Sequence, residues 1–555
     1  MPAWSPSYVH GQSNTGLLGE TIGQCFDRIV SRFPNHDALV SCHQELRFTY
    51  KQLHAEVERV ARGLLSLGVN RGARVGIFSP NCVEWPISQY AAAKVGAILV
   101  NINPAYRLRE LGYALMQSGV SVLVAARRFR SADYVAMVRE LRPELPELAH
   151  VVYLGTGSEK GAWSWADLLE RGDTIPESSL RSREATLQFD DPINIQYTSG
   201  TTGSPKGATL SHHNILNNGY FIGETLAYTE RDRICLPVPY YHCFGCVLGS
   251  LAALTHGSAV VLPGESFDAE AALRAIDAER CTSLYGVPTM FIAELDSPAF
   301  SRYCLDSLRT GIMAGSPCPI EVMRKVIDRM HMPDVTIAYG MTETSPVSFQ
   351  SAMDDPVERR VSTVGSIHPH LECKLIDPQT GEVVPRGHAG ELCTRGYAVM
   401  LGYWNDRAAT DAAIDAARWM HSGDLAVMRD DGSVNIVGRL KDMIIRGGEN
   451  IYPREIEEFL YTHPSVSDVQ VIGVPDVKYG EEVCAWIRLR DGQAATLDEI
   501  REFCRGQIAG YKIPRYVRFT TEFPMTVTGK IQKFRMREIS IAELGLTQAA
   551  STQTA

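Results

Sequence analysis

The chain has 555 residues, more than one hydrophobic core usually organises, so its length predicts at least two domains. Its composition, 45% apolar and 21% charged, is that of an ordinary globular protein and excludes a disordered or fibrous chain. The net charge of -10 argues against a broad surface for nucleic acid or an anionic membrane, because such surfaces need clustered Lys and Arg. We therefore expect no nucleic-acid partner.

No targeting or membrane-spanning segment is visible in the sequence. Residues 1–14 lack a charged start followed by an apolar block, and apolar runs such as 95–100 are too short to span a bilayer. The 13 cysteines have no regular spacing, which suits a reducing compartment better than a disulfide framework. We expect a cytoplasmic protein without an integral membrane segment.

The first half of the chain alternates strand and helix patterns. Thr49 and Gln52 form a capping-box signature ahead of apolar residues that recur at helical spacing up to residue 67. Further strands are predicted at 75–78, 97–100, 121–125, 151–154, 258–262 and 283–287, with stretches of helical length between them. This alternation indicates βαβ units, and hence a large α/β domain rich in parallel sheet.

A smaller α+β domain is predicted at the C-terminal end. A turn signal at 430–432 precedes a short strand and the charged segment 438–442. Beyond it we expect a helix from Pro453, strands at 469–474 and 483–489, and a helix capped by Thr496. The predicted division is a large N-terminal domain at 1–438, a hinge at 439–442, a small C-terminal domain at 443–545 and a polar tail at 546–555.

Residues 198–207, with the sequence TSGTTGSPKG, follow an alternating strand at 193–197. Three glycines let the backbone approach a ligand closely, five hydroxyls can donate to phosphate oxygens, and Lys206 adds positive charge. The loop is not a Walker A motif, because Gly207 follows Lys206 where Ser or Thr would be needed. The composition alone also fits a flexible surface loop, so only the order of the ten residues can distinguish a phosphate-binding loop from it.

That order resembles the signature loop of the adenylate-forming superfamily, which includes acyl-CoA synthetases, firefly-type luciferases and the adenylation domains of peptide synthetases. The resemblance extends over residues 18–539, and further motifs of the family appear there in the family's order. It implies that a carboxylic acid is activated by ATP with Mg2+ and passed to CoA, without a side-chain nucleophile. For the loop it implies ATP contacts from Thr198, Ser199, Gly200, Thr201, Thr202, Gly203 and Lys206.

The segment 339–344, YGMTET, resembles the family's second motif. The resemblance implies that Tyr339 stacks on adenine, with Gly340 beside it. It also implies that Thr342 contacts the phosphate region and that Glu343 holds Mg2+. A divalent cation on the phosphate oxygens would offset the negative charge that an incoming carboxylate meets.

Two further motifs concern the ribose and the hinge. The segment 421–424, HSGD, resembles the ribose motif with Ser422 where Thr is more usual, and implies that Asp424 accepts hydrogen bonds from the ribose hydroxyls. In the segment 438–442, GRLKD, Arg439 would also bind the ribose. Lys441 would be the hinge about which a mobile small domain turns between two half-reactions.

The last nucleotide and CoA motifs lie in the predicted small domain. The segment 446–453, RGGENIYP, resembles the loop that lines the pantetheine tunnel, where Gly447 and Gly448 would permit close approach of the thiol arm. The segment 524–530, PMTVTGK, resembles the C-terminal motif. Its Lys530 would bridge the substrate carboxylate and the α-phosphate.

The acyl side of the predicted site carries weaker signals. The segments 241–245, YHCFG, and 314–316, AGS, resemble parts of the family that line the carboxylate and acyl pocket. A lone histidine on an apolar stretch is also often structural. The candidate acyl-pocket residues are His242, Phe244, Gly315 and Ser316.

Among the branches of the superfamily, the motifs look most like medium-chain fatty acyl-CoA synthetases. Two alternatives remain open, an adenylating enzyme that loads a carrier protein and a nucleotide-binding regulator that does not catalyse. The joint presence of Glu343, Asp424 and Lys530 speaks against the regulator, because binding alone needs fewer of them. The expected catalytic residues are Lys530, Thr342, Glu343 and Lys206, and the expected small-molecule partners are ATP, CoA and a carboxylic acid.

Overall fold

The computed structural model describes all residues except 1–4, 199–204, 317, 448, 526–530 and 548–555. The chain divides into two compact units. We call the larger one, residues 9–373 and 394–421, the large unit, and the smaller one, residues 1–8, 374–393 and 422–555, the small unit. The domain boundaries expected from the sequence, at 438 and 442, stay a prediction.

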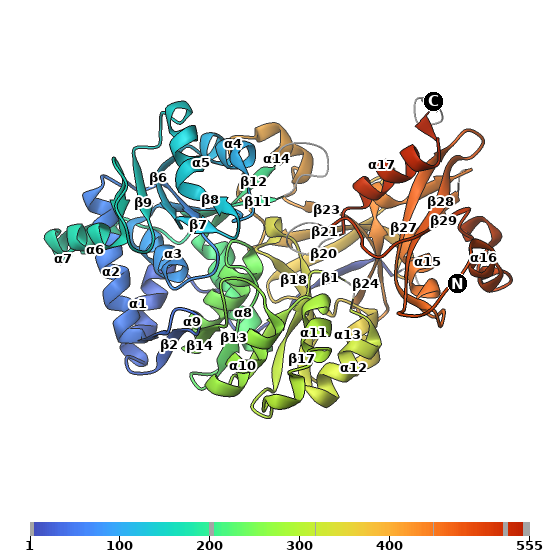
Figure 1. Cartoon of the computed structure of the whole chain (residues 1–555), viewed down its shortest axis with the longest axis horizontal. Coiled ribbons are helices and arrows are strands. Elements are labelled where there is room, and N and C mark those ends of the chain that lie inside the picture. The colour runs from blue at the N-terminus through green and yellow to red at the C-terminus, as the bar shows by residue number, and fades with distance from the viewer. Residues whose placement is uncertain (1–4, 199–204, 317, 448, 526–530, 548–555) are drawn as a thin grey trace. The chain divides into compact units, whose positions relative to one another are not determined.

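The large unit contains an eight-stranded sheet with the order β10-β9-β6-β4-β5-β11-β12-β22 (Figure 1). Its strands from β10 to β11 run parallel, whereas β12 and β22 continue the sheet antiparallel. Five of the strands expected from the sequence, β4, β5, β6, β9 and β11, are confirmed here. The bounds are β4 (Arg74–Phe78), β5 (Ile98–Asn101), β6 (Val120–Ala125), β9 (His150–Tyr153), β10 (Trp163–Ser164), β11 (Pro192–Thr198), β12 (Lys206–Ser211) and β22 (Gly402–Tyr403).

A nine-stranded sheet of the same unit has the order β19-β18-β17-β16-β15-β13-β14-β2-β3. It is parallel from β17 to β2 and antiparallel at both edges, so both large sheets have parallel interiors. The bounds are β2 (Asp37–Ser41), β3 (Leu46–Thr49), β13 (Arg233–Cys235), β14 (Ala259–Leu262), β15 (Ser283–Gly286), β16 (Thr310–Ala314), β17 (Asp334–Gly340), β18 (Val347–Gln350) and β19 (Ser366–Ile367). A short hairpin pairs β7 (Arg128–Phe129) with β8 (Ala132–Asp133).

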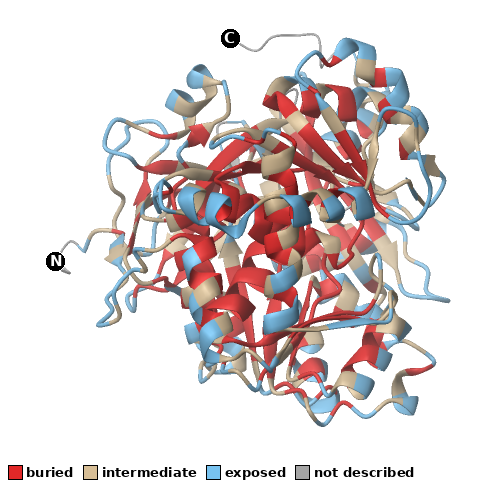
Figure 2. Ribbon diagram, turned by 90° about the vertical axis from the view of Figure 1, so that its left-hand side faces the viewer, coloured by how far each residue is buried: buried red, intermediate tan, exposed pale blue. Residues whose placement is uncertain are grey.

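Helices pack against these sheets, and α3 (Glu84–Val95) is buried along almost its whole length. Figure 2 shows the buried residues of the chain in red, mostly in its interior. The expected capping box of α2 (Tyr50–Ser66) is confirmed, because Thr49 Oγ1 accepts from the Gln52 amide and Gln52 Oε1 accepts from the Thr49 amide. Further helices are α1 (Ile22–Arg32), α4 (Leu108–Ser118), α5 (Tyr134–Leu141), α6 (Trp165–Thr174), α7 (Glu177–Glu184), α8 (His212–Thr225), α9 (Ser250–His256), α10 (Ala269–Glu279), α11 (Pro288–Leu295), α12 (Ile320–Arg329), α13 (Val357–Ser362) and α14 (Arg407–Ala413).

The small unit has its own apolar core, which includes Ile456, Val469 and Ile487. One of its sheets has the order β26-β25-β28-β27, with β29 on β28, and the predicted helix from Pro453 and the predicted strands are present. A second sheet has the order β1-β20-β21-β23-β24, and most of its residues belong to this unit. The bounds are β1 (Tyr8–His10), β20 (Leu371–Ile376), β21 (Ala389–Gly396), β23 (Met420–Met428), β24 (Val434–Arg439), β25 (Ile444–Arg446), β26 (Glu449–Ile451), α15 (Pro453–Leu460), β27 (Val466–Asp476), β28 (Gly480–Leu489), α16 (Leu497–Cys504), β29 (Tyr516–Phe519) and α17 (Lys533–Glu543).

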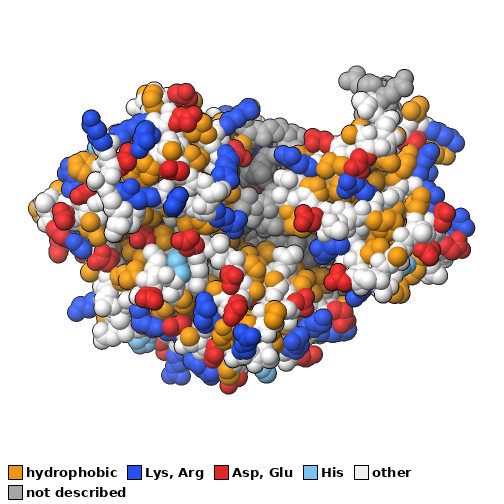
Figure 3. All heavy atoms as spheres, viewed as in Figure 1, with side chains coloured by type: hydrophobic (Ala, Val, Ile, Leu, Met, Phe, Trp, Pro, Cys, Tyr) orange, Lys and Arg blue, Asp and Glu red, His pale blue; other side chains and the backbone are white. Residues whose placement is uncertain are grey.

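The surface carries charges of both signs. On the face drawn in Figure 3, the Lys and Arg side chains are interspersed with Asp and Glu. Within the described part of the chain, no helix combines the length and the apolar character needed to cross a membrane. The cytoplasmic location stays a prediction.

One acidic side chain of the large unit is buried in the core without compensation. Glu294 lies on α11 and is 1% exposed, and neither carboxyl oxygen has a hydrogen-bond partner. Burial raises the pKa of this carboxyl well above its ordinary value, which favours its protonated form in the folded protein. A buried polar group without a partner lowers the free energy of unfolding.

We predict that Glu294→Met stabilises the protein by about 1–3 kcal/mol at neutral pH, because it removes an unsatisfied polar group. The native protein should lose stability as the pH rises past the unfolded pKa of about 4.3, since only the unfolded state then releases this proton. Glu294→Gln should lack that part of the pH dependence. Urea unfolding at pH 5 and pH 8 measures both effects, with the exposed Glu321→Gln as the control. Equal pH slopes for the native protein and Glu294→Gln would contradict the assignment.

Candidate active site

The signature loop joins two antiparallel strands of the eight-stranded sheet. Thr198 ends β11 and pairs in register with Lys206, which opens β12. The Thr198 hydroxyl lies 3.4 Å from the Lys206 carbonyl oxygen and 3.4 Å from Glu343 Oε1, so it can donate to either. The predicted contacts Ser199, Gly200, Thr201, Thr202 and Gly203 fall outside the described residues.

Glu343 lies in the short 3-10 helix Thr342–Thr344, directly after β17 of the nine-stranded sheet. Its carboxylate is buried, and Oε1 accepts a hydrogen bond of 2.9 Å from the Tyr403 hydroxyl. Its backbone oxygen accepts from the Met400 amide at 2.9 Å. Both the side chain and the backbone of Glu343 are therefore fixed by the segment that contains β22.

Lys206 and Glu343 carry opposite charges, yet they form no ion pair. The Lys206 ammonium lies 5.1 Å from the centre of the Tyr403 ring, in cation–π geometry. Among the residues that the structure describes, no Lys or Arg lies within ion-pair distance of Glu343. A buried carboxylate without a cationic neighbour is a suitable ligand for a divalent cation, whereas it is a costly structural element by itself.

Other residues of the second motif lie at the carboxyl end of β17. Tyr339 is half-buried and its ring meets Phe349 edge-on at 6.4 Å between centroids. Gly340 is exposed, and a Cβ there would lie only 1.7 Å from the Pro346 carbonyl oxygen, so the position requires glycine. The Thr342 hydroxyl lies 3.7 Å from the Cys243 sulfur. This places Thr342 next to the segment predicted for the acyl side.

The predicted acyl residues form two groups in the large unit. His242 Nδ1 accepts from the Phe244 amide at 3.1 Å, which fixes the imidazole at the start of the π-helix Phe244–Gly249. The Phe244 ring is buried and lies 5.8 Å from the Tyr285 ring. Gly315 and Ser316 are exposed directly after β16, and Gly315 has a φ of 92°, which favours glycine.

In the small unit, the structure brings the two predicted ribose residues together. Asp424 on β23 is the cross-strand neighbour of Arg439 on β24, and Arg439 Nε lies 3.0 Å from Asp424 Oδ1. The aspartate is buried whereas the arginine is exposed. The Asp424 amide donates to the Ser422 hydroxyl at 3.0 Å. The pair therefore presents a carboxylate and a guanidinium at the adjoining ends of two strands.

The remaining predicted residues of this unit are placed only in part. Lys441 is exposed in the 3-10 helix Leu440–Asp442, directly after Arg439. Gly447 follows β25 with a φ of 60°, and a Cβ there would lie 3.3 Å from the Tyr479 ring. Gly448 and Lys530 lie outside the described residues. Arg446 at the start of the motif is held by Glu482 through bonds of 2.7 and 2.9 Å.

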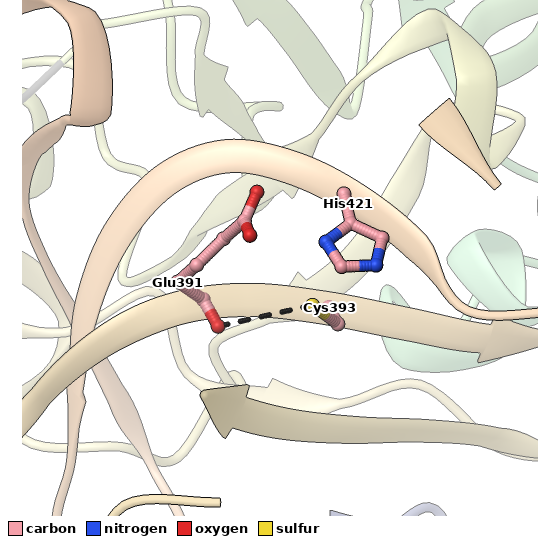
Figure 4. A group of neighbouring side chains, drawn as sticks. All are labelled: Glu391, Cys393 and His421. Atoms are coloured by element: carbon pink, nitrogen blue, oxygen red, sulfur yellow. Dashed lines mark hydrogen bonds between the residues drawn. The ribbon is translucent and has the colours of Figure 1, made fainter. Parts of the chain in front are cut away.

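Two clusters of acidic, histidine and cysteine side chains lie outside these motifs. Figure 4 shows Glu391 and Cys393 on β21, where the Cys393 thiol lies 3.9 Å from the Glu391 carbonyl oxygen. The third residue drawn there, His421, belongs to the other unit, and the group carries no metal assignment. In the large unit, Asp27 and Glu58 flank His54. Lys94 and Arg181 already pair with these carboxylates, which makes this cluster an ion-pair network.

Tyr403 lies outside all the sequence motifs described above, although it contacts two of the predicted residues. Its only local signal is an aromatic residue after Gly402, a pattern that also fits an ordinary turn. The contacts arise from the sheet order, which places β22 beside β12.

Comparison with known proteins covers nearly the whole chain. Residues 26–404 match the model of the AMP-binding enzyme family, and residues 455–530 match the model of the AMP-binding enzyme C-terminal domain. The sequence is 48% identical to a putative acyl-CoA synthetase, YngI, from Bacillus subtilis, over 96% of this chain and 99% of that protein. It is 47% identical to the mitochondrial medium-chain acyl-CoA ligase ACSF2 from Danio rerio, over 98% of this chain and 92% of that protein.

A solved structure gives the same result. The anthranilate CoA ligase AuaEII in complex with anthranoyl-AMP superposes with a TM-score of 0.84 at 28% identity, over 96% of this chain and 98% of that one. This likeness agrees with the expected α/β fold of parallel-rich sheets and a C-terminal α+β domain. With both of its family models matched in order, the chain belongs to the AMP-binding enzyme family, as an AMP-forming acyl-CoA synthetase.

Proposed function

We propose that this acyl-CoA ligase converts a medium-chain fatty acid to its CoA thioester. The substrates of the ligase are ATP, CoA and a carboxylic acid, and the reaction passes through an acyl-adenylate. The observation that carries the chemistry is the buried Glu343 carboxylate beside Thr198, with the Lys206 ammonium over the ring of Tyr403, the residue that donates to Glu343. The end of the signature loop thus has one acceptor and one cation close by. The medium-chain class rests on the relative of that name at 47% identity.

In the first half-reaction, a carboxylate oxygen of the acid attacks the α-phosphorus of ATP, and the bond from that phosphorus to the bridging oxygen of pyrophosphate breaks. We assign the phosphate contacts to the loop residues 198–203 and to Lys206. Lys530 bridges the incoming carboxylate and the α-phosphate. Preorganised donors and positive charge accelerate such a step without a covalent enzyme intermediate.

The residues around Glu343 fit a magnesium ion. The carboxylate is buried, lacks a cationic partner among the described residues, and belongs to the ligand type that Mg2+ prefers. Mg2+ bound with ATP neutralises phosphate charge. Glu343 is the residue that would hold it, and Thr342 contacts the phosphate region from the same short helix.

We assign recognition of the nucleoside to Tyr339, Gly340, Asp424 and Arg439. Tyr339 and Gly340 would accept the adenine at the carboxyl end of β17. Asp424 accepts hydrogen bonds from the ribose hydroxyls, and Arg439 fixes the Asp424 carboxylate at 3.0 Å for that purpose.

In the second half-reaction, the CoA thiolate attacks the acyl carbon of the adenylate, and the bond from that carbon to the AMP oxygen breaks. Gly447 and Gly448 would let the pantetheine arm pass close to the backbone, which the φ of 60° at Gly447 supports. Lys441, exposed within the predicted hinge, is the position at which we expect the small domain to turn between the half-reactions.

The acyl group is assigned to the region of His242, Phe244, Gly315 and Ser316. The Phe244 ring lies 5.8 Å from the ring of Tyr285, whose hydroxyl accepts a hydrogen bond of 3.0 Å from the Tyr228 hydroxyl. These side chains would bound an acyl group that lies beside Phe244. All 13 cysteines are free thiols, which supports the expected cytoplasmic location.

We predict that pyrophosphate and AMP are released with fatty acids of medium chain length in the presence of CoA, with lower kcat/KM for both acetate and long-chain acids. A panel of carboxylic acids, assayed with and without CoA, measures this. Product formed only with a carrier protein would favour the carrier-loading alternative. ATP binding without turnover of any acid would favour the regulator.

A second prediction concerns the ribose. Asp424→Asn should raise the KM for ATP by roughly ten- to a hundred-fold, since a hydrogen bond to a charged acceptor is lost. With 2′,3′-dideoxy-ATP, which lacks the hydroxyls, the same variant should differ little from the native enzyme. Asp377→Asn, a turn aspartate of the same unit, is the matched control. An equal loss with both nucleotides would argue against ribose recognition.

A third prediction separates the half-reactions. Lys530→Ala should abolish acyl-adenylate formation but spare thioester formation from a supplied adenylate, because the positive charge is needed only when the carboxylate approaches the α-phosphate. Lys533→Ala is the matched control, because Lys533 pairs with Glu457 at 2.6 Å and serves the fold. If Lys530→Ala slowed both half-reactions equally in a folded protein, the assignment would be wrong.

A further inference from the structure

Tyr403 contacts two oppositely charged residues of the phosphate site with one side chain. Its hydroxyl donates to Glu343 Oε1 at 2.9 Å, and its ring lies 5.1 Å from the Lys206 ammonium. No described residue donates to the second carboxylate oxygen of Glu343. The tyrosine therefore fixes one oxygen of the carboxylate and leaves the other for a ligand.

The backbone around Tyr403 is held on several sides. Tyr403 is paired with Ala208 across the β12–β22 ladder, and its amide donates to the Thr410 hydroxyl at 2.9 Å. The Trp404 amide donates to the Gly207 carbonyl oxygen at 2.7 Å. Gly402 has a φ of 149°, and a Cβ there would meet Thr410 at 2.9 Å. The side chain thus projects from a backbone with little freedom to move.

Opposite charges in a partly buried site attract strongly, so Lys206 and Glu343 would pair if nothing held them apart. Such a pair would occupy the lysine intended for phosphate and the carboxylate intended for a cation. The Tyr403 ring supports the lysine while the Tyr403 hydroxyl satisfies the carboxylate, and both charges stay available.

We propose that Tyr403 is a positioning residue that keeps Lys206 and Glu343 apart and oriented, so that one meets the phosphates of ATP and the other the divalent cation. The proposal rests on the proposed function, which assigns Glu343 to the cation. Tyr403 itself makes no contact with the reacting atoms in this role.

Two substitutions separate the two contacts. Tyr403→Phe removes the hydroxyl and keeps the ring, whereas Tyr403→Leu removes both. The probe is Mn2+ binding to the enzyme with ATP in the absence of acid, followed by electron paramagnetic resonance. Tyr403→Phe should weaken Mn2+ binding about ten-fold, the effect of one hydrogen bond to a charged group, with a small change in ATP affinity. Tyr403→Leu should weaken Mn2+ and ATP together, because Lys206 and Glu343 can then pair.

Two controls make the result specific. Tyr90→Phe removes another buried tyrosine hydroxyl, which meets Ser250 at 2.8 Å and touches neither charged residue, so it should leave Mn2+ affinity unchanged. In the double variant Glu343→Gln with Tyr403→Phe, the loss of Mn2+ affinity should equal that of Glu343→Gln alone. Thermal unfolding confirms that each variant is folded.

The outcomes distinguish the two proposals. If Glu343→Gln weakens Mn2+ binding but Tyr403→Phe does not, the positioning role is overturned and the function stands. If neither substitution affects Mn2+ binding, the assignment of Glu343 to the cation is wrong, and the positioning role of Tyr403 is wrong as well. A loss in Tyr403→Phe that adds fully to the loss in Glu343→Gln would also overturn the proposal, because the tyrosine would then act elsewhere.

Discussion

The hydrogen bonds to Glu343 join the two large sheets of this enzyme at the place where its phosphate chemistry is expected. Glu343 follows β17 of the nine-stranded sheet, whereas Thr198 and Tyr403 belong to the eight-stranded sheet. Each sheet ends its parallel strands in this region, and ligands of α/β proteins bind beyond the carboxyl ends of such strands. One buried carboxylate therefore has a structural and a chemical task at once.

This double task has an energetic consequence. A buried carboxylate without a cation lowers stability, and the hydrogen bonds from Tyr403 and Thr198 offset only part of the cost of removing it from water. Glu294 is the contrasting case, since its carboxyl is buried without a hydrogen-bond partner and burial raises its pKa. Glu343 instead accepts hydrogen bonds from hydroxyl donors. The difference agrees with the proposed role of Glu343 as a cation ligand and makes Glu294 a tolerated defect.

Sequence patterns predicted the elements that depend on neighbours in the chain. The capping box at Thr49 and the strands β4, β5, β6 and β9 follow from local periodicity, and the signature loop follows from a ten-residue order. Tyr403 could not be predicted in this way, because its role depends on β22 lying beside β12, a pairing between distant segments. The burial of Glu294 was missed for a similar reason, since one acidic residue at the end of an apolar helix normally reaches solvent.

The two sides of the large-unit site obey different physical rules. On the proposed phosphate side, each residue would act through charge or hydrogen bonding at a fixed distance, which restricts the residue types that can do so. On the acyl side, an apolar pocket distinguishes chains only by about 1–3 kcal/mol for each methylene group. In the proposed acyl region, chain preference would depend on the shape formed by buried side chains such as Tyr228 and Tyr285, which many apolar sequences can build. The motifs therefore predict the chemistry of this ligase, whereas its acyl preference depends on packing that the motifs do not specify.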